Sequence, residues 1–253
     1  MAFMQLHIHS QTLGMDEDVW LFLPDADKLK NPEEKTKVFL FLHGGSGDQQ
    51  TGAIDVGMAG FARDRNMAVI MPNVHRSCFV DMHMGPKYCS YLCLELLPML
   101  RSMFPFLSEK REDTIVSGFS NGGYGAFHVA FSYPELFSWT GPFAAGDKGH
   151  VDFTGRPPME KLANFGPGDL TKTKYSIKHQ AEELLKSGRV LPSVFHAHGE
   201  NEIYEIIKKV LPEFFQGLEG NPFNYSHHVI PGVGHDVKCW RIATQMFLDH
   251  IGF

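Results

Sequence analysis

The pentapeptide Gly118-Phe119-Ser120-Asn121-Gly122 is the stretch of this chain best suited to chemistry. A short β-branched run precedes it, and small residues at helical spacing follow it. A Gly-x-Ser-x-Gly turn between a strand and a helix is typical of a nucleophile elbow, where the serine hydroxyl stands exposed at the strand's carboxyl end. We therefore predict that Ser120 is a nucleophile; an ordinary glycine-rich turn is the alternative.

A serine hydroxyl is a weak nucleophile, so it needs a base to take its proton and a carboxylate to orient that base. At elbows of this kind the three groups follow the chain order serine, acid, histidine. His235 lies in a glycine-containing loop before the last helical segment and is the candidate base, whereas Asp236 is interpreted as a helix-start residue. Glu202 is the candidate acid, with Glu200 as second choice and a solvated acidic turn as the alternative.

Two backbone N–H groups must converge where the reacting carbonyl becomes an oxyanion. The sequence offers Asn121, directly after the serine, and Gly45, in the turn His43-Gly44-Gly45 that follows an apolar strand. A glycine-rich turn after a strand can also bind phosphate, but this one lacks the Gly-Lys-Ser/Thr ending of a phosphate-binding loop. We predict an oxyanion hole formed by Gly45 and Asn121.

Some neighbouring polar and small residues are candidates for binding the acyl or alcohol part of a substrate. They are Gly44, His75, Arg76, Asp81 and Tyr124. The alternative for the charged members is that loop residues pair with one another.

Fourteen histidines raise the question of a metal site. The obvious candidates are His196-Ala197-His198 and His227-His228. Neighbours one or two apart on a strand are poor chelating pairs without a third ligand, and both segments look like core strands. We predict no metal, and acyl transfer to a serine needs no other cofactor.

The elements that must position these residues alternate along the chain. Strands are predicted over residues 3–9, 18–23, 37–42, 67–71, 114–118, 137–146, 193–199 and 225–230. Helices are predicted over residues 52–65, 88–104 with a bend or break at Pro98, from the elbow to near Pro134, and over 176–186, 204–217 and 239–251. A polar linker is predicted over residues 25–37, which include Pro32.

This order, two strands and then alternating strands and helices, predicts an α/β fold with a mainly parallel sheet of about eight strands covered by helices on both faces. We expect a single domain over residues 1–253, with a lid-like excursion at about 147–175, where periodicity is lacking and glycine and proline are frequent. Because sites in such sheets lie at the carboxyl ends of strands, the candidate residues all fall at one edge.

Composition excludes several other function classes. The net charge is −6 and no run of Lys or Arg is present, which argues against nucleic acid or an anionic membrane as partner. No stretch has the length of a membrane span, and the first residues do not resemble a secretory signal. The four cysteines fit neither a disulfide framework nor a zinc knuckle, so we expect a reducing, cytoplasmic location.

Several motifs together resemble a known family. They are residues 42–47 (Leu-His-Gly-Gly-Ser-Gly), 71–77, the segment 81–91 leading to 95–98, the elbow with residues 122–126, and residues 234–236. On these motifs the chain resembles the esterase D group of α/β-hydrolases, and within it the tributyrin esterase (EstA-like) branch. Relatives in this group include S-formylglutathione hydrolases, acetyl-xylan and feruloyl esterases, and mycolyltransferases.

The resemblance implies the α/β-hydrolase fold and a serine carboxylesterase that hydrolyses small short-chain acyl esters through an acyl-serine intermediate. The alternatives are an S-formylglutathione hydrolase or other thioesterase, an acyltransferase, or a non-catalytic binding protein on the same fold. Relatives often form dimers or tetramers, so a homo-oligomer is an expectation by analogy.

Two residues depart from the family's pattern. The residue after the nucleophile is usually hydrophobic, often Met, but here it is Asn121, which still supplies its N–H and makes the lining more polar. The acid is usually Asp, but here it is Glu202, whose side chain is one methylene longer.

Overall fold

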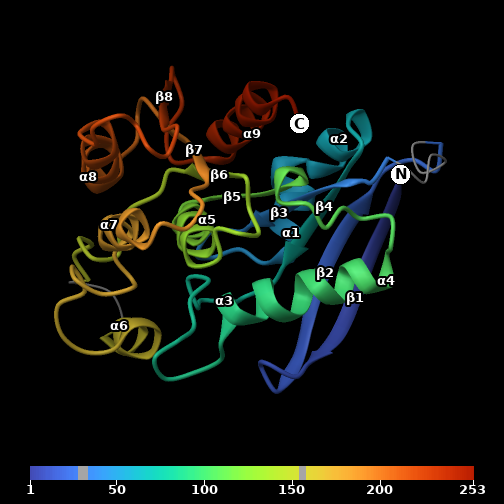
Figure 1. Ribbon diagram of the computed structural model, residues 1–253, viewed down its shortest axis with the longest axis horizontal. Helices are drawn as coiled ribbons and strands as arrows, with labels where there is room; N and C mark the ends of the chain where they lie inside the picture. Colours follow the sequence, from blue (N-terminus) through green and yellow to red (C-terminus); the bar gives the residue numbers. More distant parts are fainter. Residues whose placement is uncertain (28–33, 154–157) are drawn as a thin grey trace.

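One eight-stranded sheet runs through the molecule in the order β1-β2-β4-β3-β5-β6-β7-β8 (Figure 1). The computed structural model describes residues 1–27, 34–153 and 158–253. The strands are β1 (Ala2–Ser10), β2 (Met15–Leu23), β3 (Lys37–Leu42), β4 (Met67–Pro72), β5 (Thr114–Phe119), β6 (Trp139–Phe143), β7 (Ser193–Gly199) and β8 (Ser226–Ile230). β1, β2 and β4 pair antiparallel and the other pairs are parallel, which confirms the predicted sheet.

Side-chain alternation along the strands produces two hydrophobic cores, one on each face. In β3, Val38 and Leu40 belong to one core, whereas Phe39 and Phe41 belong to the other. Fully buried parallel strands need apolar side chains on both faces, which explains the uninterrupted apolar run of this strand.

Helices cover both faces of the sheet (Figure 1). The core that contains Phe39 is completed by α2 (Met58–Asp64) and α9 (Val237–Ile251). The opposite core is completed by α3 (Tyr88–Ser90), α4 (Leu97–Met103), α5 (Asn121–Ser132), α7 (Ile177–Ser187) and α8 (Glu205–Gln216). α6 (Pro158–Phe165) adds Phe165 to this second core.

Two predicted helices differ in detail from the structure. The helix expected over residues 52–65 is a π-helical turn, Gly52–Val56, and then α2, because Gly57 between them adopts φ 79°. Ile54, an apolar residue of the π-helical turn, is 63% exposed. The helix over 88–104 contains a π-helical segment, Tyr91–Leu96, directly before the turn that carries Pro98. A proline has no N–H to donate, so an altered bonding pattern before it is expected.

The excursion over residues 147–175 contains α6, which its sequence did not predict, and its residues 154–157 lie outside the described part of the chain. The linker predicted over 25–37 also includes residues outside that part, 28–33, among them Pro32.

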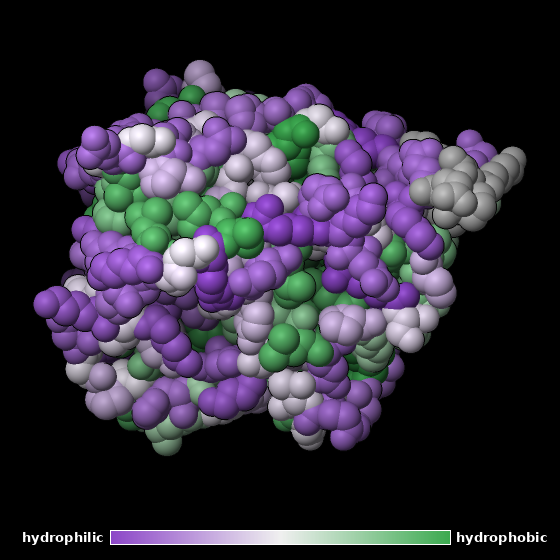
Figure 2. All heavy atoms as spheres, in the orientation of Figure 1, coloured by the Kyte–Doolittle hydropathy of each residue, from purple (hydrophilic) through white to green (hydrophobic). Residues whose placement is uncertain are grey.

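Figure 2 shows a surface on which polar side chains predominate and apolar groups form separate patches. Within the described ranges, every helix is too short or too polar to cross a lipid bilayer.

Candidate active site

Ser120 occupies the sharp turn between β5 and α5 with φ 57° and ψ −118°, a strained backbone for a residue with a side chain. Its N–H donates to the Phe143 carbonyl oxygen at 2.9 Å, which ties the turn to β6. A Cβ at Gly118 or Gly122 would lie 2.5 Å or 2.2 Å from the Leu42 carbonyl oxygen. The glycines therefore allow β3 to pass close beneath the turn, and the serine hydroxyl is left at its apex.

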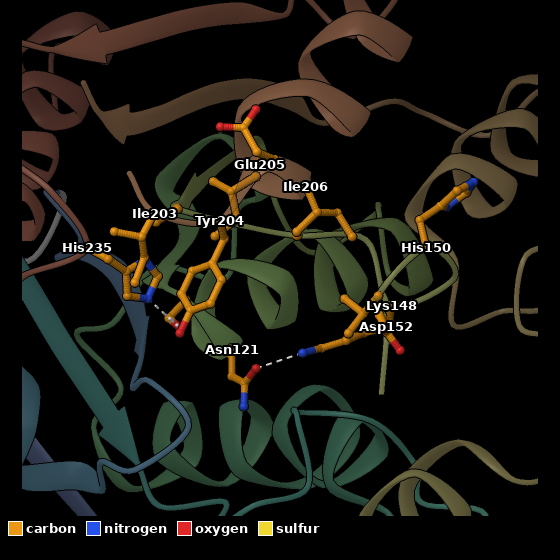
Figure 3. A pocket seen from close by; sticks show the side chains of 14 residues that line it. Asn121, Lys148, His150, Asp152, Ile203, Tyr204, Glu205, Ile206 and His235 are labelled. Atoms are coloured by element: carbon orange, nitrogen blue, oxygen red, sulfur yellow. Dashed lines mark hydrogen bonds between the residues drawn. The ribbon is translucent and has the colours of Figure 1, made fainter. Parts of the chain in front are cut away.

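Ser120, His235 and Glu202 form one continuous hydrogen-bonded chain, and Figure 3 shows the His235 ring at the wall of the cavity described below. The Ser120 hydroxyl and Nε2 of His235 are 3.0 Å apart, and Nδ1 of His235 is 2.7 Å from Oε2 of Glu202. The Glu202 carboxylate is buried and also accepts the Tyr204 N–H through Oε1 at 3.1 Å. With Nδ1–H donating to the carboxylate, Nε2 is left free to accept the serine proton.

The neighbouring carboxylates have other partners. Glu200 accepts the Gly232 N–H at 3.0 Å and so supports the loop that carries His235 instead of contacting its ring. Asp236 accepts the Cys239 N–H at 2.9 Å and caps α9, as predicted. Of the two candidate acids, the structure therefore brings Glu202 to the imidazole.

The turn after β3 is fixed by a buried histidine. Nδ1–H of His43 donates to the Gly44 carbonyl oxygen at 2.7 Å, and Nε2 accepts the Val74 N–H at 3.2 Å. Burial lowers the pKa of His43, so the ring remains neutral with one donor and one acceptor nitrogen. Gly44 faces the Phe119 ring, where a Cβ would lie 2.6 Å away, and is thus a packing residue of this turn.

Gly45 and the side chain of Asn121, the two residues predicted for the oxyanion hole, are neighbours. A Cβ on Gly45 would lie 2.4 Å from Nδ2 of Asn121, so only glycine leaves room for that side chain. In the described part of the chain, neither the Gly45 N–H nor the Asn121 N–H has a backbone acceptor outside regular elements. Two converging N–H groups beside a serine hydroxyl are what a developing oxyanion needs.

A cavity of about 640 Å³ opens onto Ser120 and His235. Its apolar wall consists of Val151, Ile203, Tyr204, Ile206 and Ile207. Its polar end consists of Lys148, His150 and Asp152, and Figure 3 shows these side chains across the cavity from His235 and Tyr204. The ring of Tyr204 meets the His235 ring edge-on, with centroids 5.2 Å apart.

The substrate-pocket predictions need correction. Tyr124 is fully buried and donates its hydroxyl to the Tyr175 carbonyl oxygen at 2.9 Å, so it lies beneath the cavity and does not line it. His75 and Arg76 border a separate hollow of about 450 Å³. Arg76 pairs with Glu160 at 2.7 Å, which corresponds to the alternative of loop residues paired with one another.

Two further predictions concern the same loops and the histidines. Asp81 accepts the Ser90 N–H and hydroxyl at 2.9 Å and 2.6 Å, so it too is paired within its own region. The rings of His196 and His227 pack together, with centroids 5.5 Å apart. Over the described ranges, no group of three His, Cys, Asp or Glu side chains is arranged to hold a metal ion.

The cavity residues that the sequence reasoning missed come from two segments, the one after β6 and the one after Glu202. Lys148 follows β6 within the aperiodic excursion, so no pattern marked it. Ile203 and Tyr204 directly follow the candidate acid, and their position beside it was the available signal.

Comparisons with known proteins agree with this geometry. A family model described as "Putative esterase" matches residues 10–153, which is more than half of the chain. An acetyl esterase from Caldicellulosiruptor saccharolyticus is 29% identical over 143 residues, which make up 54% of this chain and 53% of the relative. The match therefore spans about half the length of that curated relative.

Two solved structures are similar over nearly their full length. The fluorophosphonate-binding serine hydrolase FphF of Staphylococcus aureus has a TM-score of 0.88 at 24% identity, covering 99% of this chain and 98% of its own. The S-formylglutathione hydrolase FrmB of Staphylococcus aureus has a TM-score of 0.85 at 25% identity, with the same coverage. From the sheet, the elbow and the family match together, the chain belongs to this esterase family and has the α/β-hydrolase fold.

Proposed function

We propose that the chain is a serine carboxylesterase that hydrolyses short-chain acyl esters, with Ser120 as nucleophile, His235 as base and Glu202 as the group that orients the base. The observation that carries this proposal is the hydrogen-bonded chain from the Ser120 hydroxyl through His235 to the buried Glu202 carboxylate. Both distances are within the range that proton transfer requires.

The first half-reaction forms the acyl-serine. Oγ of Ser120 attacks the ester carbonyl carbon while Nε2 of His235 takes its proton, and the Glu202 carboxylate stabilises the resulting imidazolium. The N–H groups of Gly45 and Asn121 hold the negative oxygen of the tetrahedral intermediate. When this intermediate collapses, the C–O bond to the alcohol breaks and the leaving oxygen receives the proton from His235.

The second half-reaction returns the free enzyme. A water molecule gives its proton to Nε2 of His235 and attacks the acyl carbon, again forming an oxyanion in the same hole. Collapse of this intermediate releases the carboxylic acid, and His235 returns the proton to Oγ of Ser120. Apart from the ester and one water molecule, no group outside the chain is needed to balance the two steps.

The preference for a short acyl group, and a place in the tributyrin esterase branch, are the finer parts of the proposal. They are supported by the motifs shared with that branch and by the match to a relative described as an acetyl esterase. We also propose a reducing, cytoplasmic location, which is supported by four buried cysteines whose number and spacing do not suit a disulfide framework.

Thioester hydrolysis is a second candidate, because the same three groups attack a thioester carbonyl equally well. The observation that favours it is the full-length similarity to an S-formylglutathione hydrolase at 25% identity. Comparing kcat/KM for p-nitrophenyl acetate, S-formylglutathione and an acetylated xylo-oligosaccharide separates the substrate classes. A higher value for the thioester would replace the ester assignment.

The proposed chemistry is tested by hydrolysis of p-nitrophenyl acetate by the wild type and by Ser120→Ala. Loss of the nucleophile is expected to lower kcat by at least roughly 10⁴-fold. Ser102→Ala, on the exposed side of α4, is the matched control and should retain full activity. Equal rates for the wild type and Ser120→Ala would favour a non-catalytic binding protein instead.

A further inference from the structure

A nearly buried lysine ammonium lies in the same cavity as the candidate nucleophile. Lys148 is only 5% exposed, and its Nζ donates to Oδ1 of Asn121 at 2.7 Å (Figure 3). Taking an ammonium group out of water is costly unless hydrogen bonds compensate for the lost hydration. A charge kept at this position, against the residue that follows the nucleophile, therefore points to a role in the site.

The backbone that carries Lys148 is firmly held. The preceding residue, Asp147, is completely buried, and its carboxylate accepts the N–H groups of Gly149 and Ile177 and the Ser176 hydroxyl, each at 2.9 Å. These bonds join the start of the excursion to the first turn of α7. The Lys148 side chain consequently extends from a fixed anchor, which lowers the entropy lost in ordering it.

The ammonium group of Lys148 also contacts the ring of Tyr124. Nζ of Lys148 lies 5.3 Å from the centre of the Tyr124 ring, close enough for a cation–π interaction. Tyr124 is itself fixed through its hydroxyl, which bonds to the Tyr175 carbonyl oxygen. The start of the excursion, α5 and the segment leading into α7 thus converge to keep one cation beside Asn121.

Asn121 is held from both sides. Its Oδ1 accepts from Lys148, and its Nδ2 packs against Gly45, where a Cβ would be only 2.4 Å away. The side chain therefore spans the gap between the cation and the turn after β3. Because Asn121 and Gly45 carry the two N–H groups proposed for the oxyanion hole, this contact sets their relative position.

We propose that Lys148 is a positioning residue of the oxyanion hole. It acts through the Asn121 side chain and fixes the position of the Asn121 N–H relative to the Gly45 N–H. This inference rests on the proposed esterase function and adds to it a residue that the reaction does not formally require.

The inference is tested by a double-mutant cycle on p-nitrophenyl acetate with Lys148→Met, Asn121→Ala and the double variant. Loss of a direct oxyanion donor costs about 10²–10³-fold in kcat, so we expect a smaller loss, roughly tenfold, from this indirect contact. The loss should appear in kcat with KM within about twofold, because the oxyanion exists only in the transition state. The double variant should be no slower than Asn121→Ala, since both changes remove the same interaction.

Rescue and control variants complete the experiment. Lys148→Arg should recover part of the activity, because a guanidinium group can still donate to Oδ1 of Asn121. Lys172→Met, an exposed lysine of the same excursion, should behave like the wild type. If Lys148→Met does not fold, Lys148→Arg and Asn121→Ala carry the test: a wild-type kcat in Asn121→Ala would refute the role of Lys148, because that role acts through the Asn121 side chain.

The results that would refute the esterase proposal differ from those that would refute only the role of Lys148. A wild type no faster than Ser120→Ala would refute the esterase proposal and the role of Lys148 with it. An active wild type with an unchanged Lys148→Met would refute only the role of Lys148. Additive losses in the double variant, or a change confined to KM, would also refute it, because Lys148 would then act independently of Asn121.

Discussion

Nδ1 of His235 lies 2.7 Å from the Glu202 carboxylate, on the side of the ring opposite the serine hydroxyl. The carboxylate is buried, so the bond is shielded from water and fixes both the orientation and the tautomer of the imidazole. This relationship distinguishes two glutamates that are only two residues apart in the sequence.

We expect Glu202→Gln to lower kcat by about 10⁴-fold, because an amide donor favours the wrong tautomer of His235. Glu200→Gln is the matched control and should retain kcat within a few-fold, since the Glu200 carboxylate accepts the Gly232 N–H of the loop and Glu202 is the carboxylate at the His235 ring. Both are measured by p-nitrophenyl acetate hydrolysis. A severe loss in Glu200→Gln with an active Glu202→Gln would reverse the assignment.

We expect Gly122→Ala to destabilise the fold by about 3 kcal/mol, because the new methyl group would meet backbone oxygens that cannot move aside. The Leu42 and His43 carbonyl oxygens would lie 2.2 Å and 2.5 Å from it. Gly60→Ala, in α2 with no atom within 4 Å of its Cβ position, should be neutral or stabilise by up to ~1 kcal/mol. Urea unfolding measures both, and equal stabilities would contradict this packing.

The stability of the protein should fall as the pH drops below about 6.5. Burial lowers the pKa of His227 to about 4 and holds the pKa of His196 well below 6.5. In the folded state these rings resist protonation, whereas in the unfolded chain they take up protons near pH 6.5. Unfolding therefore binds protons in this window, and the free energy of unfolding decreases as acid is added.

His227→Gln removes one of these groups and isolates its contribution. Between pH 7 and pH 5 this variant should lose about 1 kcal/mol less unfolding free energy than the wild type, allowing for partial solvent screening of the ring. His9→Gln, at an exposed ring on β1, is the control. The same pH slope in His227→Gln and the wild type would be incompatible with a lowered pKa for the half-buried His227.

We expect Tyr124→Phe to lower stability by ~1 kcal/mol, because the Tyr175 carbonyl oxygen loses its buried donor. Since Tyr124 lies beneath the cavity, KM for p-nitrophenyl acetate should stay within about twofold of the wild type. Thermal unfolding measures the expected loss of stability, and steady-state kinetics measure KM. A several-fold rise in KM at unchanged stability would return Tyr124 to the substrate pocket.

The parts of the site predictable from the sequence are those that local patterns encode. A strand followed by Gly-x-Ser-x-Gly and small helical residues defines the position of Ser120, and a glycine-rich loop before the last helix marks His235. The apolar runs give the strands, and their order gives the sheet, because connections in such folds have few alternatives. Each of these signals acts over a few neighbouring residues.

The remaining parts depend on contacts between distant segments. Lys148 meets Asn121 across 27 residues, from a segment without periodicity. Glu200 and Glu202 both follow β7, and only the path of the loop decides which of them contacts His235. Tyr124 was a candidate for the substrate pocket, but α5 is buried nearly all round, so its closeness to the nucleophile in sequence does not determine whether its side chain reaches the cavity.

The most direct test of the central claim is covalent labelling of the protein by a fluorophosphonate probe, followed by intact-mass and peptide analysis. The account predicts one adduct per chain, on Ser120, which is absent in Ser120→Ala and forms much more slowly in His235→Ala because the base is missing. Labelling at another residue, or a wild type that does not react, would contradict the proposal that Ser120 is an activated nucleophile.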